Sequence, residues 1–122
     1  MARKLEVVVV DDEEQITELL KTFILYTDKE VQIHTFNDSM VAKDFIANHP
    51  VDMLITDYKM PRFNGLQLME SAPREIRKVI ISGDESGIKR ENLQELNATF
   101  FEKPLPLRAL ARIISEEQEV LR

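Results

Sequence analysis

The stretch Met53-Leu-Ile-Thr-Asp-Tyr-Lys-Met-Pro-Arg-Phe-Asn-Gly65 places one acidic side chain directly after a short apolar segment. The apolar part, Met53–Thr56, has no polar face, and such a run is typical of a buried strand in a parallel sheet. The proline and glycine that follow Asp57 favour a loop at this point. The stretch therefore predicts a strand whose carboxyl end presents the Asp57 carboxylate.

Polar groups also follow the other apolar runs of this kind. They are Asp11 and Asp12 after Leu5–Val10, Ser82 after Val79–Ile81, and Lys103 after Ala98–Phe101. Because the carboxyl ends of parallel strands meet at the same edge of a sheet, we expect these groups to lie in one crevice with Asp57.

Segments with a helical spacing of apolar residues alternate with the predicted strands. The predicted helices are Ile16–Ile24, Val41–Ile46, Leu66–Met69, Gly87–Leu96 and Leu107–Leu121. In the first of them, the apolar stripe consists of Ile16, Leu19, Leu20, Phe23 and Ile24. The third must end before Pro73 and is expected to be short. A further strand, Val31–Phe36, alternates apolar and polar residues, which indicates a half-exposed strand at the edge of the sheet.

Five strands alternating with five helices predict one doubly wound α/β domain over residues 1–122, a three-layer sandwich of the flavodoxin-like type. Right-handed crossovers and the edge position of the second strand favour the strand order 2-1-3-4-5. In that order the strands are added first towards one edge of the sheet and then towards the other, and this switch point lies between the first and third strands. Asp11, Asp12 and Asp57 flank it.

Length and composition limit the possible functions. A chain of 122 residues suits one domain, and the absence of cysteine excludes disulfides and thiolate metal sites. No apolar run approaches the roughly 20 residues of a membrane span, and no signal peptide is indicated, so we expect a cytoplasmic protein. The net charge of −6 argues against direct nucleic-acid binding. The basic pairs Arg77-Lys78 and Lys89-Arg90 are interpreted as solvated surface residues.

The predicted crevice combines groups that suit phosphoryl transfer. Three crowded carboxylates need a counter-charge at neutral pH, and a hard divalent cation such as Mg²⁺ supplies it. Lys103 can neutralise a phosphoryl oxygen, and Ser82 can donate a hydrogen bond to another. Because in-line transfer depends mainly on positioning and electrostatics, this set is sufficient for Asp57 to act as the nucleophile.

The chain resembles a response-regulator receiver domain of two-component signal transduction, similar to the bacterial chemotaxis response regulator, over essentially its whole length. The matching pieces are Val10-Asp11-Asp12-Glu13, Asp57-x-x-Met60-Pro61-x-x-x-Gly65, Ser82-Gly83 and Phe101-Glu102-Lys103-Pro104. Each piece alone is weak, but the four in order, each at the end of a predicted strand, form a specific signal.

The resemblance implies a phosphorylation site with a metal ion. Asp57 would accept a phosphoryl group from a phosphohistidine of a sensor histidine kinase or phosphotransfer protein, or from a small acyl phosphate. Asp12 and Asp57 would bind Mg²⁺ directly, Asp11 mainly through water, and the backbone carbonyl of Lys59 would complete the protein ligands. Lys103 would pair with the acceptor and then with the phosphate.

The resemblance also implies a conformational switch. Ser82 would be the switch hydroxyl, Phe100 the aromatic switch residue, and the Lys103–Pro104 peptide bond would be cis. The response would be a changed surface on the fourth helix, fifth strand and fifth helix, read by a partner protein or a fused effector, with a homodimer through that surface as a further option. By the same resemblance, the protein would be a phospho-acceptor signalling domain, not an enzyme acting on other substrates, and it would promote the phosphorylation and dephosphorylation of its own aspartate.

Several positions depart from the common family pattern. Phe100 replaces a frequent tyrosine, and Asn97 stands where glycine is usual before the fifth strand. Lys59 and Asp84 lie two residues beyond Asp57 and Ser82 and are expected to overhang the entrance. The span between Asp57 and Ser82 is shorter than usual, which truncates the third helix.

Other interpretations stay open at the sequence level. The acidic run after the first strand could be a helix N-terminus, and Ser82 could be a simple strand-end hydroxyl. The whole chain could be a receiver-like interaction module that works without phosphate, or a phosphohydrolase of another α/β family. The phosphohydrolase is disfavoured because such enzymes commonly carry two acids two residues apart on the first strand, whereas Asp11 and Asp12 are adjacent, and because no cap insertion is long enough to enclose a substrate. His34 and His49 are interpreted as surface residues, and Met40, Met53, Met60 and Met69 as core fillers.

Overall fold

The computed structural model describes residues 3–83 and 90–121 and contains one parallel sheet. Its strands are β1 (Leu5–Val10), β2 (Val31–Phe36), β3 (Met53–Asp57), β4 (Arg77–Ser82) and β5 (Ala98–Glu102). They are arranged in the order β2-β1-β3-β4-β5, and every neighbouring pair is parallel. The predicted fold class and strand order are confirmed.

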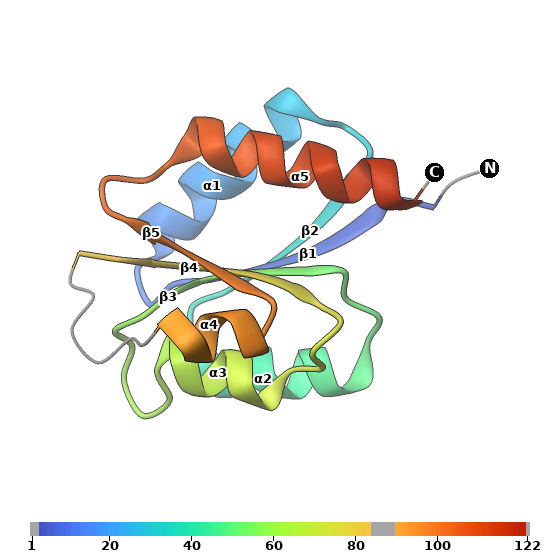
Figure 1. Ribbon diagram of the computed structural model, residues 1–122. Helices are drawn as coiled ribbons and strands as arrows, with labels where there is room; N and C mark the ends of the chain where they lie inside the picture. The colour runs from blue at the N-terminus through green and yellow to red at the C-terminus, as the bar shows by residue number, and fades with distance from the viewer. Residues whose placement is uncertain (1–2, 84–89, 122) are drawn as a thin grey trace.

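The helices cover both faces of the sheet (Figure 1). They are α1 (Glu14–Thr27), α2 (Ser39–Asn48), α3 (Gly65–Ser71), α4 (Arg90–Glu95) and α5 (Leu107–Leu121). Helices α1 and α5 lie together on one face, and α2, α3 and α4 lie on the other. The carboxyl ends of the strands all point to the left edge of the sheet in Figure 1. This arrangement gathers the loops that follow β1, β3, β4 and β5 at one edge.

Two hydrophobic clusters fill the space between the sheet and the helix layers. Alternate residues of β1 show the division, since Val7 and Val9 belong to the cluster under α1 and α5, whereas Val8 and Val10 belong to the cluster on the other side. Successive side chains of a strand point to opposite faces, so a strand buried on both faces needs an unbroken apolar run. This requirement explains the four consecutive valines.

Local sequence signals set the helix boundaries. Helix α3 begins with a capping box in which the Asn64 side chain accepts a hydrogen bond from the Gln67 N–H, and the Gln67 side chain accepts one from the Asn64 N–H. It ends at Ser71, before Pro73, as expected. At α2, the Asp38 side chain accepts a hydrogen bond from the Met40 N–H. Asn97 has φ of 59°, the left-handed conformation that asparagine tolerates where glycine is usual.

Several sequence-based expectations are wrong in detail. Leu19 is 47% exposed, so it lies outside the buried stripe of α1, and Met40, at 37% exposed, is not a core filler. His34 is partly buried, with its Nε2 2.7 Å from Glu6 Oε1. The largest error concerns Lys78, which is fully buried in β4 instead of lying on the surface.

The buried ammonium of Lys78 is stabilised by backbone carbonyls. Its Nζ donates to Pro73 O at 2.8 Å, to Ile76 O at 2.9 Å and to Leu96 O at 2.8 Å. A lysine can be buried when its donors are all satisfied, and these three close carbonyls match the three ammonium protons, with a fourth, Arg74 O, farther away at 3.4 Å.

Within the described parts of the chain, no helix has the length and apolar character needed to cross a membrane.

Candidate functional site

Three carboxylates meet at the carboxyl edge of the sheet. Asp57 is the last residue of β3, and Asp11 and Asp12 directly follow β1. One oxygen from each lies within 4.8 Å of the others. Asp11 and Asp57 are buried, whereas Asp12 is exposed. The parallel register of β1 and β3 produces this cluster, because Val10 pairs with Thr56 and both strands then end at the same level.

Lys103 brings a positive charge to this cluster. Its Nζ is 3.5 Å from Asp57 Oδ1, and its backbone N–H donates to Ser82 O at 2.9 Å. The backbone bond extends the pairing of β4 with β5 by one residue and fixes the segment that carries the lysine. The Lys103–Pro104 peptide bond is cis.

Burial and mutual repulsion disfavour the ionised forms of these acids. Burial raises the pKa of Asp11 to about 6, and the nearby Asp57 and Asp12 carboxylates add to that effect, against a hydrogen bond from the Glu13 N–H at 2.9 Å. Burial also raises the pKa of Asp57, although Lys103 and the Tyr58 N–H oppose the increase. A cation bound beside these carboxylates would therefore reduce the repulsion between them and favour their ionised forms.

A small cavity adjoins Asp57. It has a volume of about 280 Å³ and is lined by Asp57, Lys59, Ser82, Gly83 and Lys103. This volume is just below the range typical of sites for drug-sized ligands, so the cavity suits a small group. The residues around it offer a carboxylate (Asp57), two lysine side chains (Lys59 and Lys103) and a hydroxyl (Ser82).

Comparison with known proteins identifies the family. The family model described as "Response regulator receiver domain" matches residues 7–115. The chain belongs to the response-regulator receiver family. Response regulators are signalling proteins of two-component systems, where they act with histidine kinases and effectors.

The receiver resembles part of longer curated proteins. It is 32% identical over 111 residues to "Response regulator GtcR" of Aneurinibacillus migulanus, an alignment covering 88% of this chain and 45% of that protein. It is also 32% identical over 123 residues to "Transcriptional regulatory protein HptR" of Staphylococcus aureus, covering 93% and 49% respectively. The chain thus spans about half the length of these relatives.

Solved structures share the fold of the receiver. The receiver domain of the Francisella response regulator 1452 superposes with a TM-score of 0.82 at 20% identity, covering 98% of this chain and 100% of that chain. A CheY-like receiver domain protein from Methanospirillum hungatei gives a TM-score of 0.81 at 18% identity, covering 96% and 98%. At these identities the likeness concerns the fold.

The structure brings most of the sequence-predicted site residues of the receiver together. Five line or adjoin the same crevice, namely Asp11, Asp12, Asp57, Ser82 and Lys103. Lys59 is exposed and lines the same cavity as Asp57, whereas Asp84 lies outside the described residues.

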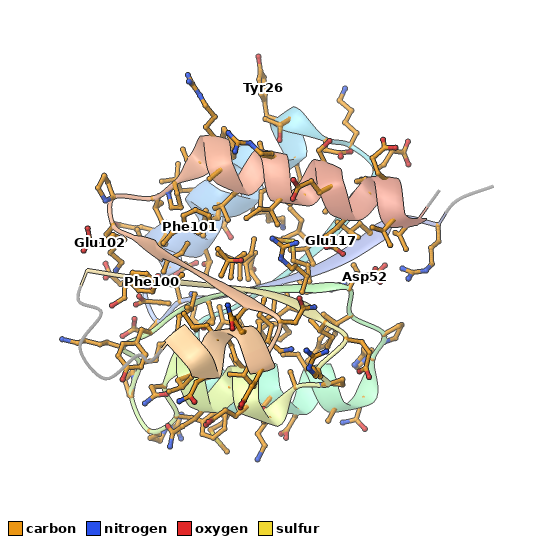
Figure 2. All side chains as sticks on the ribbon, viewed as in Figure 1. Tyr26, Asp52, Phe100, Phe101, Glu102 and Glu117 are labelled. Atoms are coloured by element: carbon orange, nitrogen blue, oxygen red, sulfur yellow. The ribbon has the colours of Figure 1, made fainter. Side chains whose placement is uncertain are left out.

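Phe100, the aromatic residue predicted for switching, lies within β5, three residues before Lys103. Phe100 is partly buried against the cluster beneath α2, α3 and α4, while Phe101 packs against the cluster beneath α1 and α5 (Figure 2). Phe100 pairs with Ile80 in the sheet, two residues before Ser82 on β4. The ring and the hydroxyl therefore lie on the same side of neighbouring strands.

Two contacts that shape the site were not found from the sequence. A Cβ atom on Gly65 would lie 2.1 Å from Asp57 O, so α3 can start this close to Asp57 only with glycine. The side chain of Asn37 donates to Asp11 O at 2.8 Å. The first residue stands in the recognised motif, but its contact does not follow from the motif. The second lies in a loop with no pattern of its own.

Proposed function

We propose that this receiver accepts a phosphoryl group on Asp57 from a phosphohistidine of a sensor histidine kinase or phosphotransfer protein, in a reaction that depends on Mg²⁺. The observation that carries the proposal is the gathering of Asp11, Asp12 and Asp57 within 4.8 Å, with Lys103 Nζ 3.5 Å from Asp57 Oδ1. Family membership supports it, since phospho-acceptor receivers are the general case in response regulators.

In the proposed transfer, a carboxylate oxygen of Asp57 attacks the phosphorus atom. The new O–P bond forms as the P–N bond to the histidine breaks, and the imidazole nitrogen keeps the electron pair of that bond. Lys103 neutralises one phosphoryl oxygen, and Ser82, which lines the same cavity, donates its hydroxyl to another. These residues position and stabilise charge, which is the main need of a loose in-line transfer.

The residues present fit a magnesium ion. Clustered carboxylate oxygens are the ligands that Mg²⁺ prefers, and partial burial of the cluster raises the gain from a counter-charge. We assign Asp12, Asp57 and the backbone carbonyl of Lys59 as direct ligands and Asp11 as a ligand through water. When bound there, Mg²⁺ would neutralise charge on the acids and on the phosphoryl oxygens.

The proposed output is a change on the surface of α4, β5 and α5. Once the Asp57 phosphate attracts Ser82, the ring of Phe100 would turn inward into the space that Ser82 vacates, and the surface around the ring would change with it. Because Phe100 has no hydroxyl, the switch would rest on packing alone. A downstream protein, a fused effector or a second copy of the chain would read that surface.

A mass measurement tests the proposal. We expect incubation with a small acyl phosphate and Mg²⁺ to add one phosphate-sized adduct in intact-mass spectrometry, and Asp57→Asn to remove it. Asp52→Asn is the matched control, because Asp52 is bound to Arg3 away from the site, and it should keep the adduct. A wild-type chain that gains no adduct, or an adduct that persists in Asp57→Asn, would contradict the proposal, and the first result would favour a phosphate-independent interaction module.

A further inference from the structure

The loop between β2 and α2 holds the acidic turn that follows β1. Asn37 Nδ2 donates to Asp11 O at 2.8 Å and to Thr17 Oγ1 at 3.1 Å. The Asp11 carbonyl belongs to the peptide group that joins Asp11 to Asp12. Asn37 therefore fixes the plane from which both carboxylates project.

The chemistry of its partners sets the orientation of the Asn37 amide. A backbone carbonyl such as Asp11 O only accepts hydrogen bonds. The Thr17 hydroxyl donates to Glu14 O at 3.0 Å, which leaves its oxygen to act as an acceptor towards Asn37. Both partners thus require the NH₂ group of Asn37, and the reversed amide would place an oxygen against two acceptors.

The neighbouring peptide groups show how the turn is held. The Asp11 N–H donates to Phe36 O at 3.1 Å, and Asp11 Oδ1 accepts from the Glu13 N–H at 2.9 Å. The backbone N–H of Asp11 is thus held by the end of β2, and its C=O is held by the next residue of the chain after β2. Loss of the Asn37 amide would release one side of this two-sided support.

The same loop also reaches the segment that follows β3. Asp38 Oδ2 lies 2.6 Å from Arg62 Nη2, and residues of all three loops, among them Asp12, Asn37 and Pro61, line a small cavity of about 80 Å³. The Asp38–Arg62 pair is exposed, at 41% and 68% respectively, and such pairs contribute little. The hydrogen bonds of the Asn37 amide, in contrast, are partly buried, so this amide is the contact that should matter more for the turn.

We propose that Asn37 is a positioning residue for the acidic site, which sets the Asp11–Asp12 geometry and so favours Mg²⁺ over a larger cation such as Ca²⁺. This inference rests on the proposed Mg²⁺ site. Mg²⁺ requires near-ideal octahedral geometry with short bonds, whereas Ca²⁺ accepts variable geometry. A loosened turn should therefore weaken Mg²⁺ binding more than Ca²⁺ binding.

Calorimetric titration of the metal-free protein with Mg²⁺ and with Ca²⁺ tests the inference, at a temperature well below unfolding. We expect Asn37→Ala to raise the Kd for Mg²⁺ on the order of 10-fold, the lower end of the effect of losing a contact that orients a metal ligand. The Kd for Ca²⁺ should rise by less than about 3-fold. Arg62→Asn, which suits the φ of 68° at this position, should change the Kd for Mg²⁺ by less than about 3-fold.

Asn48→Ala is the matched control. Asn48 Nδ2 donates to Asp44 O at 2.7 Å in α2, so its loss removes a similar amide bond outside the acidic turn. Both dissociation constants should stay unchanged in this variant. A wild-type chain that binds Mg²⁺ and an Asn37→Ala chain that binds it equally well would overturn the positioning role alone, as would an equal loss of both cations. A wild-type chain that binds no Mg²⁺ would overturn the metal site and this inference together.

Discussion

Asp11 carries an electrostatic penalty in the metal-free folded protein. It is 4% exposed, and burial raises its pKa to about 6, above the usual range of a carboxyl group. A folded-state pKa above the unfolded value means that the folded protein binds the proton more tightly. Stability from this group is therefore present at low pH and is lost as the pH rises through about 4 to 6.

The first prediction follows from that sign. In EDTA, Asp11→Asn should raise the free energy of unfolding on the order of 2 kcal/mol near neutral pH, and the gain should shrink as the pH falls towards about 4. Urea unfolding at both pH values measures it. Asp52→Asn is a control of opposite sign, because Arg3 lowers the pKa of Asp52 and its loss should destabilise the protein at neutral pH. An Asp11→Asn chain that is less stable than wild type near neutral pH would contradict the prediction.

Gly65 supports the second prediction. An added methyl group would lie 2.1 Å from Asp57 O, and because this neighbour is backbone, the start of α3 or the end of β3 would have to shift. Gly65→Ala should lower the free energy of unfolding by about 2–4 kcal/mol, since overpacking against a fixed neighbour is at the upper end of such changes. Gly83→Ala is the matched control, as nothing lies within 4 Å of its added carbon. Equal stability of the two variants, measured by urea unfolding, would contradict the clash.

At the residue scale, sequence reasoning found the charged groups and missed their supports. Asp11, Asp57 and Lys103 could be placed because strand ends are readable from apolar runs, and parallel strands end at one edge. Asn37 could not be placed, because its partner is a backbone carbonyl of another loop. The clash at Gly65 likewise depends on a distance that no sequence pattern contains.

At the element scale, β4 connects the two segments that flank it. Lys78 points to the same side of β4 as Ser82, and its Nζ joins the turn after α3 to the carbonyl of Leu96, directly after α4. The sequence indicated a surface lysine because a charge next to an arginine usually lies in water. Its burial depends on the carbonyl groups of residues 73–76 and of Leu96, whose positions in space cannot be predicted from the periodicity of apolar residues.

The third prediction concerns this buried ammonium. Lys78→Met keeps the length of the side chain but leaves the carbonyls without their donor, so the free energy of unfolding should fall by about 2–3 kcal/mol. Hydrogen exchange should rise most in residues 73–76 and 93–97, the segments that the ammonium joins. Lys29→Met, at an exposed position, should change stability by less than about 0.5 kcal/mol. A Lys78→Met chain as stable as wild type would mean that water satisfies those carbonyls.

The elements themselves were largely predictable. Four strands follow from apolar runs, β2 follows from its alternation of apolar and polar residues, and the shortness of α3 follows from Pro73, whereas the capping box at Asn64 and Gln67 was not recognised. Helix α4 has few apolar residues, and its described part, Arg90–Glu95, is short, with Leu93 buried. With few apolar residues, the helical periodicity of the sequence is weak and does not predict where the helix begins and ends. Its limits then depend on packing and on contacts such as that of Lys78 with Leu96.

At the scale of the whole molecule, the proposed metal site would make stability depend on a cation. Three carboxyl groups within 4.8 Å oppose folding in a chain whose net charge is already −6. A ligand that binds only the folded state adds RT ln(1 + [L]/Kd) to its stability, about 2.7 kcal/mol at 100 times the Kd. For a domain of this size, that gain corresponds to a rise in Tm on the order of 10 °C.

The fourth prediction is that Mg²⁺ raises the Tm of the wild-type protein by this order, while NaCl of equal ionic strength raises it much less. Asp12→Asn should lose most of the increase, because Asp12 is exposed and we assign it as a direct ligand of the ion. Asp11→Asn should start from a higher Tm in EDTA and gain less from Mg²⁺. The substitution already removes part of the repulsion between the carboxylates, so less repulsion is left for the cation to reduce. Differential scanning calorimetry at several Mg²⁺ concentrations measures all three. If both variants gained as much as wild type, the cation would be acting elsewhere on the molecule, and the edge where β1 and β3 end would not be the metal site.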